Sequence, residues 1–330
     1  MTLCPQCKSW VHREPLDFLV GRSIGPYHVE GLLGIGAIGV VYRVRPSLDA
    51  PAVALKLMFP DADDESAEQR FLREAQVLRE LRHPNIVRAE DVAMSEWGPP
   101  YYTMEALDGR NLREVLRGLP KGMPLPEALE HARQIGAGLQ HAHSTGLIHR
   151  DVKPENIFVV PAAGGFVDKL LDFGFAKWVA GRRRLRLTAD GDVVGTPAYL
   201  TPEQVGLAPP GPPTDQYALA LVVAELLTGR KVRQGMEPVE IATREVQRPL
   251  PADRLAGTAL PEHVVRALVR ATEPMPQDRF PDIATFVEAL EGRTGRTRRR
   301  RSRRRAVVFV ALLLALAAAV TVWLWLGSGR

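Results

Sequence analysis

The sequence predicts an α+β fold of two lobes, β-rich first and mainly helical second, plus one C-terminal transmembrane helix. Three observations predict it: apolar residues alternate between glycines over residues 27–57, helical periodicity dominates after Leu112, and residues 306–326 carry no charge. A ligand cleft is expected between the lobes. The chain divides into an N-terminal segment (1–21), a folded unit (22–292, with lobes 22–104 and 105–292), an Arg-rich segment (293–305), the membrane helix (306–326) and a short outer tail (327–330).

The elements follow from the spacing of apolar residues. Short antiparallel strands are expected from Tyr27 to about Leu57, where Val, Leu, Ile and Tyr are interrupted by glycines. An amphipathic helix is expected over 61–82, and His83-Pro84-Asn85 ends it because the residue before proline avoids helical dihedrals. Further strands are expected at 86–93 and 101–105, and helices near 112–118, 126–145, 216–229, 261–272 and 282–291.

The net charge is unevenly distributed. The 330 residues carry 43 Lys and Arg against 38 Asp and Glu, a formal charge of +5. Ten arginines and no acid lie in 293–330, so residues 1–292 retain 33 basic residues (43 − 10) against all 38 acidic ones. The folded unit is therefore mildly acidic, and we expect no nucleic-acid partner, because binding to phosphates requires basic groups on the folded surface.

The apolar span predicts a membrane anchor. Its 21 residues, at 1.5 Å each, would extend about 31 Å as a helix, the thickness of the hydrocarbon core. Nine arginines lie between Arg293 and Arg305, which by the positive-inside rule places the folded unit in the cytoplasm of a single-pass membrane protein. The alternatives are a buried core helix, or a nuclear-localisation or RNA-binding role for the arginines. The small residues 317–319 are compatible with a homodimer through this helix.

Cys4 and Cys7 form one C-x-x-C pair, which resembles half of a zinc ribbon. A closed tetrahedral zinc site needs four ligands, and the chain has no second cysteine pair. We expect no zinc at Cys4 and Cys7, although His12 as a third ligand, completion by a dimer, and a redox role remain open alternatives.

A glycine-rich segment predicts nucleotide binding. Residues 34–41, GIGAIGVV, read G-x-G-x-x-G-x-V, and glycines allow the backbone to approach phosphates closely. A dinucleotide-binding dehydrogenase has nearly the same string, but its loop opens a helix, whereas VVYRVR continues as a strand. The segment therefore indicates a flap over a nucleotide. Lys56, in VALK on the next strand, could hold phosphates, although a lone strand lysine is usually solvent-facing.

Two later motifs identify a family. Residues 148–157 read IHRDVKPENI, and Asp172-Phe173-Gly174 follows. Together with GIGAIGVV and VALK, these motifs resemble the eukaryotic-like serine/threonine protein kinases of the bacterial type, from about Tyr27 to Glu291. The resemblance implies a two-lobed kinase fold that uses ATP with Mg²⁺ or Mn²⁺. It also implies transfer of the γ-phosphoryl group to serine or threonine hydroxyls of proteins, here in membrane-associated signalling.

The resemblance also assigns residues. Asp151 would orient the substrate hydroxyl and accept its proton, and Lys153 would lie near the γ-phosphate. Lys56 would pair with Glu74, and Asn156 and Asp172 would hold the metal. The implied nucleotide site comprises Leu33, Gly34, Ile35, Gly36, Ala37, Ile38, Gly39, Val40, Val41, Ala54, Lys56, the gatekeeper Met104, and the hinge residues Glu105, Leu107 and Asp108.

Scaffold and control residues follow from the same resemblance. Glu203 is expected to pair with Arg279, and Asp215 to support the backbone of the catalytic loop. Arg150 before the catalytic aspartate implies control by phosphorylation of the activation segment (172–203), with Thr188 as the expected autophosphorylation site. A basic run at 182–186 would grip this phosphate, attract acidic substrates, or simply be solvated. Thr201 replaces the alanine of the usual APE motif, and we expect activity to be retained.

Two other functions remain as alternatives. A pseudokinase scaffold would bind nucleotide or partners without transfer. Such a protein would be expected to lack catalytic residues, but this chain has them all: Lys56, Glu74, Asp151, Asn156 and Asp172. A small-molecule kinase would share the fold, but GTPAYLTPE (195–203) resembles a peptide-docking element.

Overall fold

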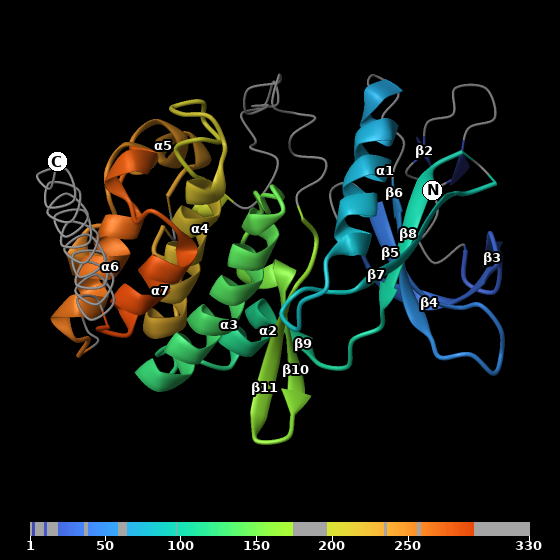
Figure 1. The fold of residues 1–330 in the computed structure, drawn as a ribbon, viewed down its shortest axis with the longest axis horizontal. Helices are drawn as coiled ribbons and strands as arrows, with labels where there is room; N and C mark the ends of the chain where they lie inside the picture. The colour runs from blue at the N-terminus through green and yellow to red at the C-terminus, as the bar shows by residue number, and fades with distance from the viewer. Residues whose placement is uncertain are drawn as a thin grey trace, which may run out of the picture.

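The computed structural model describes residues 2–3, 10–11, 19–35, 39–58, 65–96, 98–173, 197–233, 236–255 and 259–293. One part is an antiparallel sheet with a single long helix beside it, and the other is mainly helical with a small sheet at its near side (Figure 1). The predicted α+β fold with two lobes is therefore confirmed.

The N-lobe is built on a six-stranded sheet of order β3-β4-β5-β6-β8-β7. Its strands are β3 (Ser23–Ile24), β4 (Tyr27–Ile35), β5 (Gly39–Arg45), β6 (Val53–Met58), β7 (Ala89–Met94) and β8 (Pro100–Glu105). In the register of β6 and β8, Lys56 lies opposite Tyr102 and Ala54 opposite Met104. Because side chains alternate along a strand, these four residues share one face of the sheet.

Apolar side chains cover both faces of this sheet. We call one group the outer sheet cluster; it comprises Leu19, Ile24, Tyr27, Val29, Val40, Tyr42, Val44, Leu55, Leu57 and Tyr101. On the other face lies α1 (Glu65–Glu80), whose Phe71, Ala75 and Leu78 are buried at helical spacing. The helix ends before Pro84, as predicted. The outer sheet cluster thus covers one face of the sheet. The other face carries Lys56 and Tyr102 and packs against α1.

The C-lobe is organised around one buried helix. Its helices are α2 (Leu112–Arg117), α3 (Leu125–Ser144), α4 (Pro212–Thr228), α5 (Pro238–Thr243), α6 (Glu262–Ala271) and α7 (Ile283–Leu290). Every residue of α4 from Thr214 to Thr228 is buried, and α3, α6 and α7 pack around it. Gly229 ends α4 at φ 70°, and a Cβ there would lie 2.3 Å from the backbone nitrogen of Gly122. Only glycine fits this helix end.

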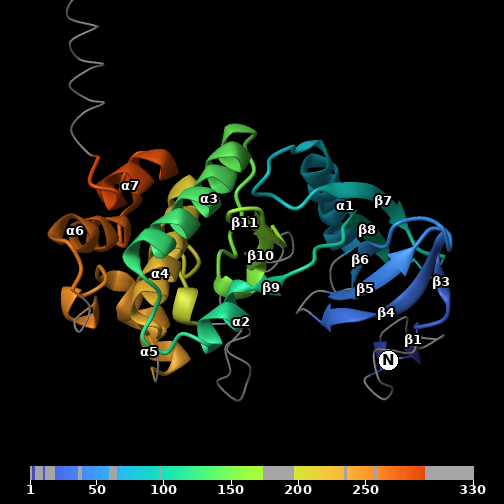
Figure 2. The same cartoon turned by 90° about the horizontal axis from the view of Figure 1, so that it is seen from below.

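A second sheet was not predicted. It has the order β11-β10-β9, with β9 (Arg110–Asn111), β10 (Ile157–Ala162) and β11 (Gly165–Leu170), and it lies between the large sheet and the helices (Figure 2). The turn Ala163-Gly164 joins β10 to β11, with Ala162 paired to Gly165. Gly164 has φ 84° in this turn, a conformation that glycine adopts readily. The elements expected after Leu112 were all helices, and they included neither these strands nor α5.

The termini add little to the described fold. A short pairing joins β1 (Thr2–Leu3) to β2 (Trp10–Val11). None of the helices in the described ranges combines the length and apolar character needed to cross a bilayer. The predicted membrane helix (306–326), the Arg-rich segment after Arg293, and Cys4 and Cys7 lie outside the described residues.

Candidate active site

The loop between α3 and β10 fixes the orientation of the Asp151 carboxylate. Its Oδ2 atom lies 2.9 Å from Lys153 Nζ and accepts a hydrogen bond from Asn156 Nδ2 at 3.0 Å. A 3₁₀ turn at Pro154–Asn156 folds the chain back, so that Asn156 Nδ2 also donates to the Asp151 backbone carbonyl at 2.9 Å. Three residues that the sequence predicted for one site are thus brought together.

The backbone of this loop is held by Asp215 from α4. The carboxylate accepts hydrogen bonds from the backbone N–H groups of His149 at 2.8 Å and Arg150 at 2.7 Å, and His143 Nε2 lies 2.7 Å away. Arg150 has a left-handed backbone, φ 63°, and its carbonyl accepts a bond from Gln204 Nε2 at 2.9 Å. These bonds offset the cost of that conformation. The predicted scaffold role of Asp215 is confirmed.

His149 links the catalytic loop to the segment before Asp172. Its Nε2 lies 2.8 Å from the Leu171 carbonyl, which can only accept, so Nε2 carries the proton. Its Nδ1 accepts from the Asp151 backbone N–H at 3.3 Å. Complete burial lowers the pKa of His149, an effect only partly offset by Asp215 and Asp151, so the ring is neutral at pH 7.

Asp172 is contacted by two side chains of the N-lobe sheet. Lys56 Nζ lies 2.6 Å from Asp172 Oδ1, and the Tyr102 hydroxyl donates to the same oxygen at 3.4 Å. Both Lys56 and Tyr102 are buried, whereas the Asp172 side chain is 33% exposed. The predicted partner of Lys56 was Glu74, whose side chain lies outside the described residues. Among the described residues Lys56 pairs with Asp172, and the pairing with Glu74 stays a prediction.

The glycine-rich segment joins two strands, as predicted. β4 ends at Ile35 and β5 begins at Gly39, while Gly36, Ala37 and Ile38 lie outside the described residues. A strand after the glycines excludes the dinucleotide-binding arrangement, in which a helix follows. Gly39 has a packing reason of its own, because a Cβ there would lie 2.3 Å from the Leu57 carbonyl oxygen.

Val40 and Val41, both predicted nucleotide contacts, have side chains on opposite faces of the sheet. The Val40 side chain belongs to the outer sheet cluster, while its neighbour Val41 packs against the core on the other face with Ala54 and Met104. Strand alternation forces this division. The side chain of Val41, not that of Val40, is therefore on the same face as Lys56.

The remaining predicted nucleotide contacts lie on β4 and the hinge. Leu33 and Ile35 are exposed, with 54% and 58% of their surface accessible, and Gly34 is half-buried. In the hinge, Leu107 is half-buried and Asp108 exposed. The Glu105 carboxylate is bound by Lys169 Nζ at 2.7 Å and the Arg88 backbone N–H at 2.8 Å. Its side chain thus connects the hinge to β11, and its backbone N–H donates to the Arg88 carbonyl at 3.0 Å.

The predicted scaffold pair Glu203–Arg279 is confirmed. Glu203 Oε1 and Arg279 Nη1 are 2.6 Å apart, and both side chains are fully buried. Thr201 is also buried, which excludes its hydroxyl from ready modification. Thr188 and the basic run 182–186 lie outside the described residues.

A network around Arg113 was missed by the sequence reasoning. Arg113, on α2, pairs with Glu155 of the catalytic loop at 2.9 Å and with Glu225 of α4, and the Tyr199 hydroxyl contacts Arg113 and Glu225. Burial and the neighbouring Glu225 raise the pKa of Tyr199, which stays neutral. No local signal joins residues that are 42 and 112 positions apart.

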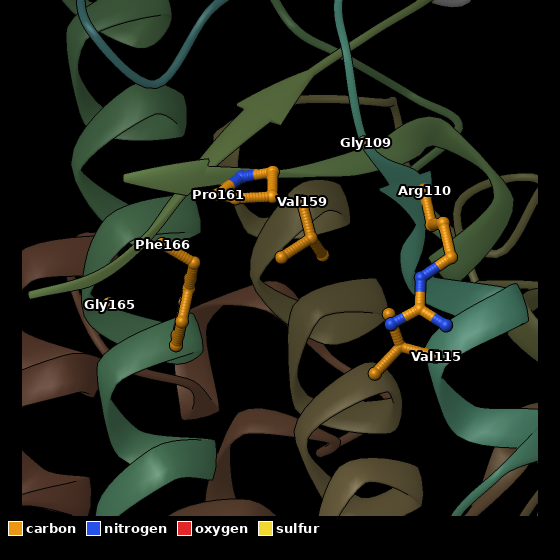
Figure 3. Close-up of a pocket in the computed structure, with 7 residues that line it drawn as sticks. All are labelled: Gly109, Arg110, Val115, Val159, Pro161, Gly165 and Phe166. Carbon is orange, nitrogen blue, oxygen red and sulfur yellow. The ribbon is translucent and has the colours of Figure 1, made fainter. Parts of the chain in front are cut away.

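A pocket on the small sheet is not the candidate active site (Figure 3). It is lined by Gly109, Arg110, Val115, Val159, Pro161, Gly165 and Phe166. Arg110 is the single charged lining residue, and the lining contains no group that could act as a base or metal ligand. The chemistry-bearing residues gather instead around Asp151 and Asp172.

Comparisons with known proteins agree with this geometry. The protein kinase domain family matches residues 27–273. Serine/threonine-protein kinase pkn3 of Myxococcus xanthus is 34% identical over 86% of this chain and 53% of its own length, and PrkC of Bacillus subtilis is 34% identical over 79% and 40%. The chain thus spans about half, or less, of these relatives.

Solved structures show the same fold. A crystal structure of the Mycobacterium tuberculosis PknI kinase domain superposes with a TM-score of 0.64 and 27% identity, covering 84% of this chain and 98% of that one. The family match, the relatives and the arrangement of Lys56, Asp151 and Asp172 lead to one conclusion. The chain belongs to the protein kinase domain family, in the bacterial eukaryotic-like serine/threonine group.

Proposed function

We propose that this protein is a serine/threonine protein kinase that transfers the γ-phosphoryl group of ATP to hydroxyls of protein substrates. The observation that carries the proposal is the Asp151 carboxylate, oriented by Lys153 and Asn156 beside a second carboxylate, Asp172, that pairs with Lys56. The relatives in Myxococcus xanthus and Bacillus subtilis are serine/threonine-protein kinases, which supports the substrate class.

Asp151 is the group that would act on the substrate hydroxyl. Two donors hold its Oδ2 atom, so the carboxylate is oriented before a substrate arrives. An oriented carboxylate can accept the proton of a serine or threonine hydroxyl as that oxygen attacks phosphorus. The Lys153 ammonium, 2.9 Å from Asp151, adds positive charge where phosphoryl oxygens would lie.

The donor set fits a Mg²⁺ ion bound with ATP. Asp172 offers a carboxylate, and Asn156 offers an amide oxygen, because its Nδ2 is committed to Asp151. Within the described ranges no three His, Cys, Asp or Glu residues gather in a metal-binding cluster. Mg²⁺ typically uses one or two protein oxygens and takes its other ligands from phosphates and water. When bound, the ion neutralises charge that develops during transfer.

Transfer is tested with the full chain and radiolabelled ATP. The full chain in detergent is incubated with a generic basic protein, beside Asp151→Asn and a control, Asp253→Asn, an exposed aspartate outside the site. We expect the D151N variant to lose at least about 100-fold in rate, since general base catalysis contributes at least this much, and D253N to match the wild type. ATP binding without transfer by the wild type would refute the kinase proposal and favour the pseudokinase scaffold.

We also propose that the folded unit faces the cytoplasm from a single membrane helix at 306–326. The uncharged span and the nine arginines before it support this topology. The test is flotation with liposomes of the full chain and of a Leu314→Arg, Leu316→Arg variant, whose charges are costly at mid-bilayer depth. Equal flotation of both would contradict the anchor.

Control by autophosphorylation at Thr188 is a further part of the proposal. It is supported by Arg150, which precedes the catalytic aspartate and whose side chain could pair with a phosphate. Phosphopeptide mapping of the active wild type, with Asp151→Asn as the inactive control, is expected to find phosphate at Thr188 in the wild type alone. An unmodified Thr188 in fully active protein would refute it.

A further inference from the structure

The proposed mechanism assigns no role to Tyr102, a buried tyrosine beside Lys56. It is on β8, directly opposite Lys56 in the register of β6 and β8, and its side chain is completely buried. Its ring packs against Phe71 of α1, with centroids 5.6 Å apart. A buried phenol needs a partner for its hydroxyl, and the partner here is Asp172 Oδ1 at 3.4 Å.

The contact joins three elements at one oxygen atom. Lys56 from β6 and Tyr102 from β8 both reach Asp172 Oδ1, and Asp172 itself has a left-handed backbone at φ 43°. Two donors on a single oxygen fix the rotation of the carboxylate, and with it the position of Oδ2. A phenolic hydroxyl holds its proton at neutral pH, so Tyr102 is a donor to this oxygen.

We propose that Tyr102 is a positioning residue, which orients the Asp172 carboxylate for binding of a divalent cation with the nucleotide. The inference rests on the proposed kinase function, since that function assigns the cation to Asp172. Lys56 is the other donor to Oδ1, but an ammonium is also attracted to phosphates. Tyr102 is neutral and fixed in the core by its ring, so its hydroxyl stays with Asp172 whichever partner Lys56 takes.

The chain provides a matched control one residue away. Tyr101 is also on β8 and also buried, but it points to the opposite face, where it packs against Tyr27 in the outer sheet cluster. Tyr101→Phe and Tyr102→Phe therefore remove the same atom from neighbouring positions. Tyr102→Leu, with a different shape, serves as a second variant without the hydroxyl.

The test measures cation binding without catalysis. Mn²⁺ is titrated into the full chain in detergent with saturating ADP, free Mn²⁺ is followed by electron paramagnetic resonance, and each variant is first checked for thermal unfolding close to the wild type. We expect Tyr102→Phe and Tyr102→Leu to weaken Mn²⁺ binding about fivefold, the effect of one lost hydrogen bond, and Tyr101→Phe to leave it unchanged. In transfer assays the Mg²⁺ requirement should rise by the same factor, with kcat retained at saturating Mg²⁺.

The outcomes separate the inference from the proposed function. Unchanged Mn²⁺ binding in the Tyr102 variants, or an equal loss in Tyr101→Phe, would overturn the positioning role. Weaker Mn²⁺ binding in the Tyr102 variants of a protein that transfers no phosphate would support the positioning role and refute the kinase proposal.

Discussion

The two carboxylates of the active site are held in different ways. Asp151 stands on a loop whose backbone is bound by Asp215 from the most buried helix of the C-lobe. Asp172 is held by the side chains of Lys56 and Tyr102, which come from the N-lobe sheet. One carboxylate is thus positioned within a single lobe, while the other depends on how the two lobes meet. Substitutions that weaken the support of Asp151 should therefore lower the free energy of unfolding. Substitutions that weaken the support of Asp172 should mainly change the binding of cation and nucleotide.

The largest effect is expected at Asp215. Replacement by alanine leaves the backbone N–H groups of His149 and Arg150 without their acceptor inside the protein. We expect Asp215→Ala to lower the free energy of unfolding by about 3–5 kcal/mol, comparable to breaking a buried charged network, and to abolish transfer. Denaturant unfolding measures the loss. Asp253→Ala, at an exposed aspartate of the same lobe, should stay within about 0.5 kcal/mol of wild type.

The buried Glu203–Arg279 pair gives a second test of how contacts within the C-lobe contribute to the free energy of unfolding. Arg279→Met leaves Glu203 buried without its partner, and should cost about 3 kcal/mol. The double variant Glu203→Gln, Arg279→Met buries no lone charge, so its loss should be smaller than the sum of the two single losses. A double-mutant cycle by denaturant unfolding gives the coupling. Simple additivity would show that the pair does not act as a unit.

The loss of stability at acidic pH should depend on His149. Burial holds its pKa in the folded protein below the 6.5 of the unfolded chain. The unfolded chain therefore binds a proton that the folded one does not, and stability present above pH 6.5 is lost as pH falls toward the folded pKa, by up to about 1.4 kcal/mol per pH unit.

Two variants test this histidine. His149→Phe cannot take up the proton, so its unfolding free energy should fall less steeply between pH 7 and 5.5 than that of the wild type. His28→Phe, at an exposed histidine of β4, should keep the wild-type slope. Equal slopes in all three proteins would remove His149 as the source of the acid sensitivity.

The smallest effect on stability is expected at Lys169 and Glu105, which join β11 to the hinge. Both side chains are partly exposed, so Lys169→Met should cost less than about 1 kcal/mol. Because the pair connects the two lobes, nucleotide affinity should change about two- to threefold, measured by calorimetry with ADP. Arg133→Met, which breaks the exposed Glu130–Arg133 pair within α3, should leave ADP affinity unchanged.

The sequence was most informative where function restricts a short segment. The HRDVKPEN string predicted that Asp151, Lys153 and Asn156 share one site, and the VVYRVR run predicted a strand after the glycines. The β10–β11 hairpin was missed because only helices were assigned after Leu112, and residues 157–170 were assigned to no element. The Arg113 network and the Tyr102 hydroxyl bond depend on contacts between residues 26 to 112 positions apart, which local patterns do not encode. The face that Tyr102 occupies could have been predicted, because Tyr102 is two residues from Met104 on the same strand.

The Asp215 carboxylate should also slow amide hydrogen exchange in the catalytic loop. The catalytic loop from Leu147 to Lys153 contains neither helix nor strand, and loops of that kind usually exchange their amide hydrogens within seconds to minutes. The amides of His149 and Arg150, however, end on a carboxylate that water does not reach. They can exchange with deuterium only when α4 itself is exposed. The segment that performs the chemistry should therefore be among the last in the protein to open, on the same timescale as the core.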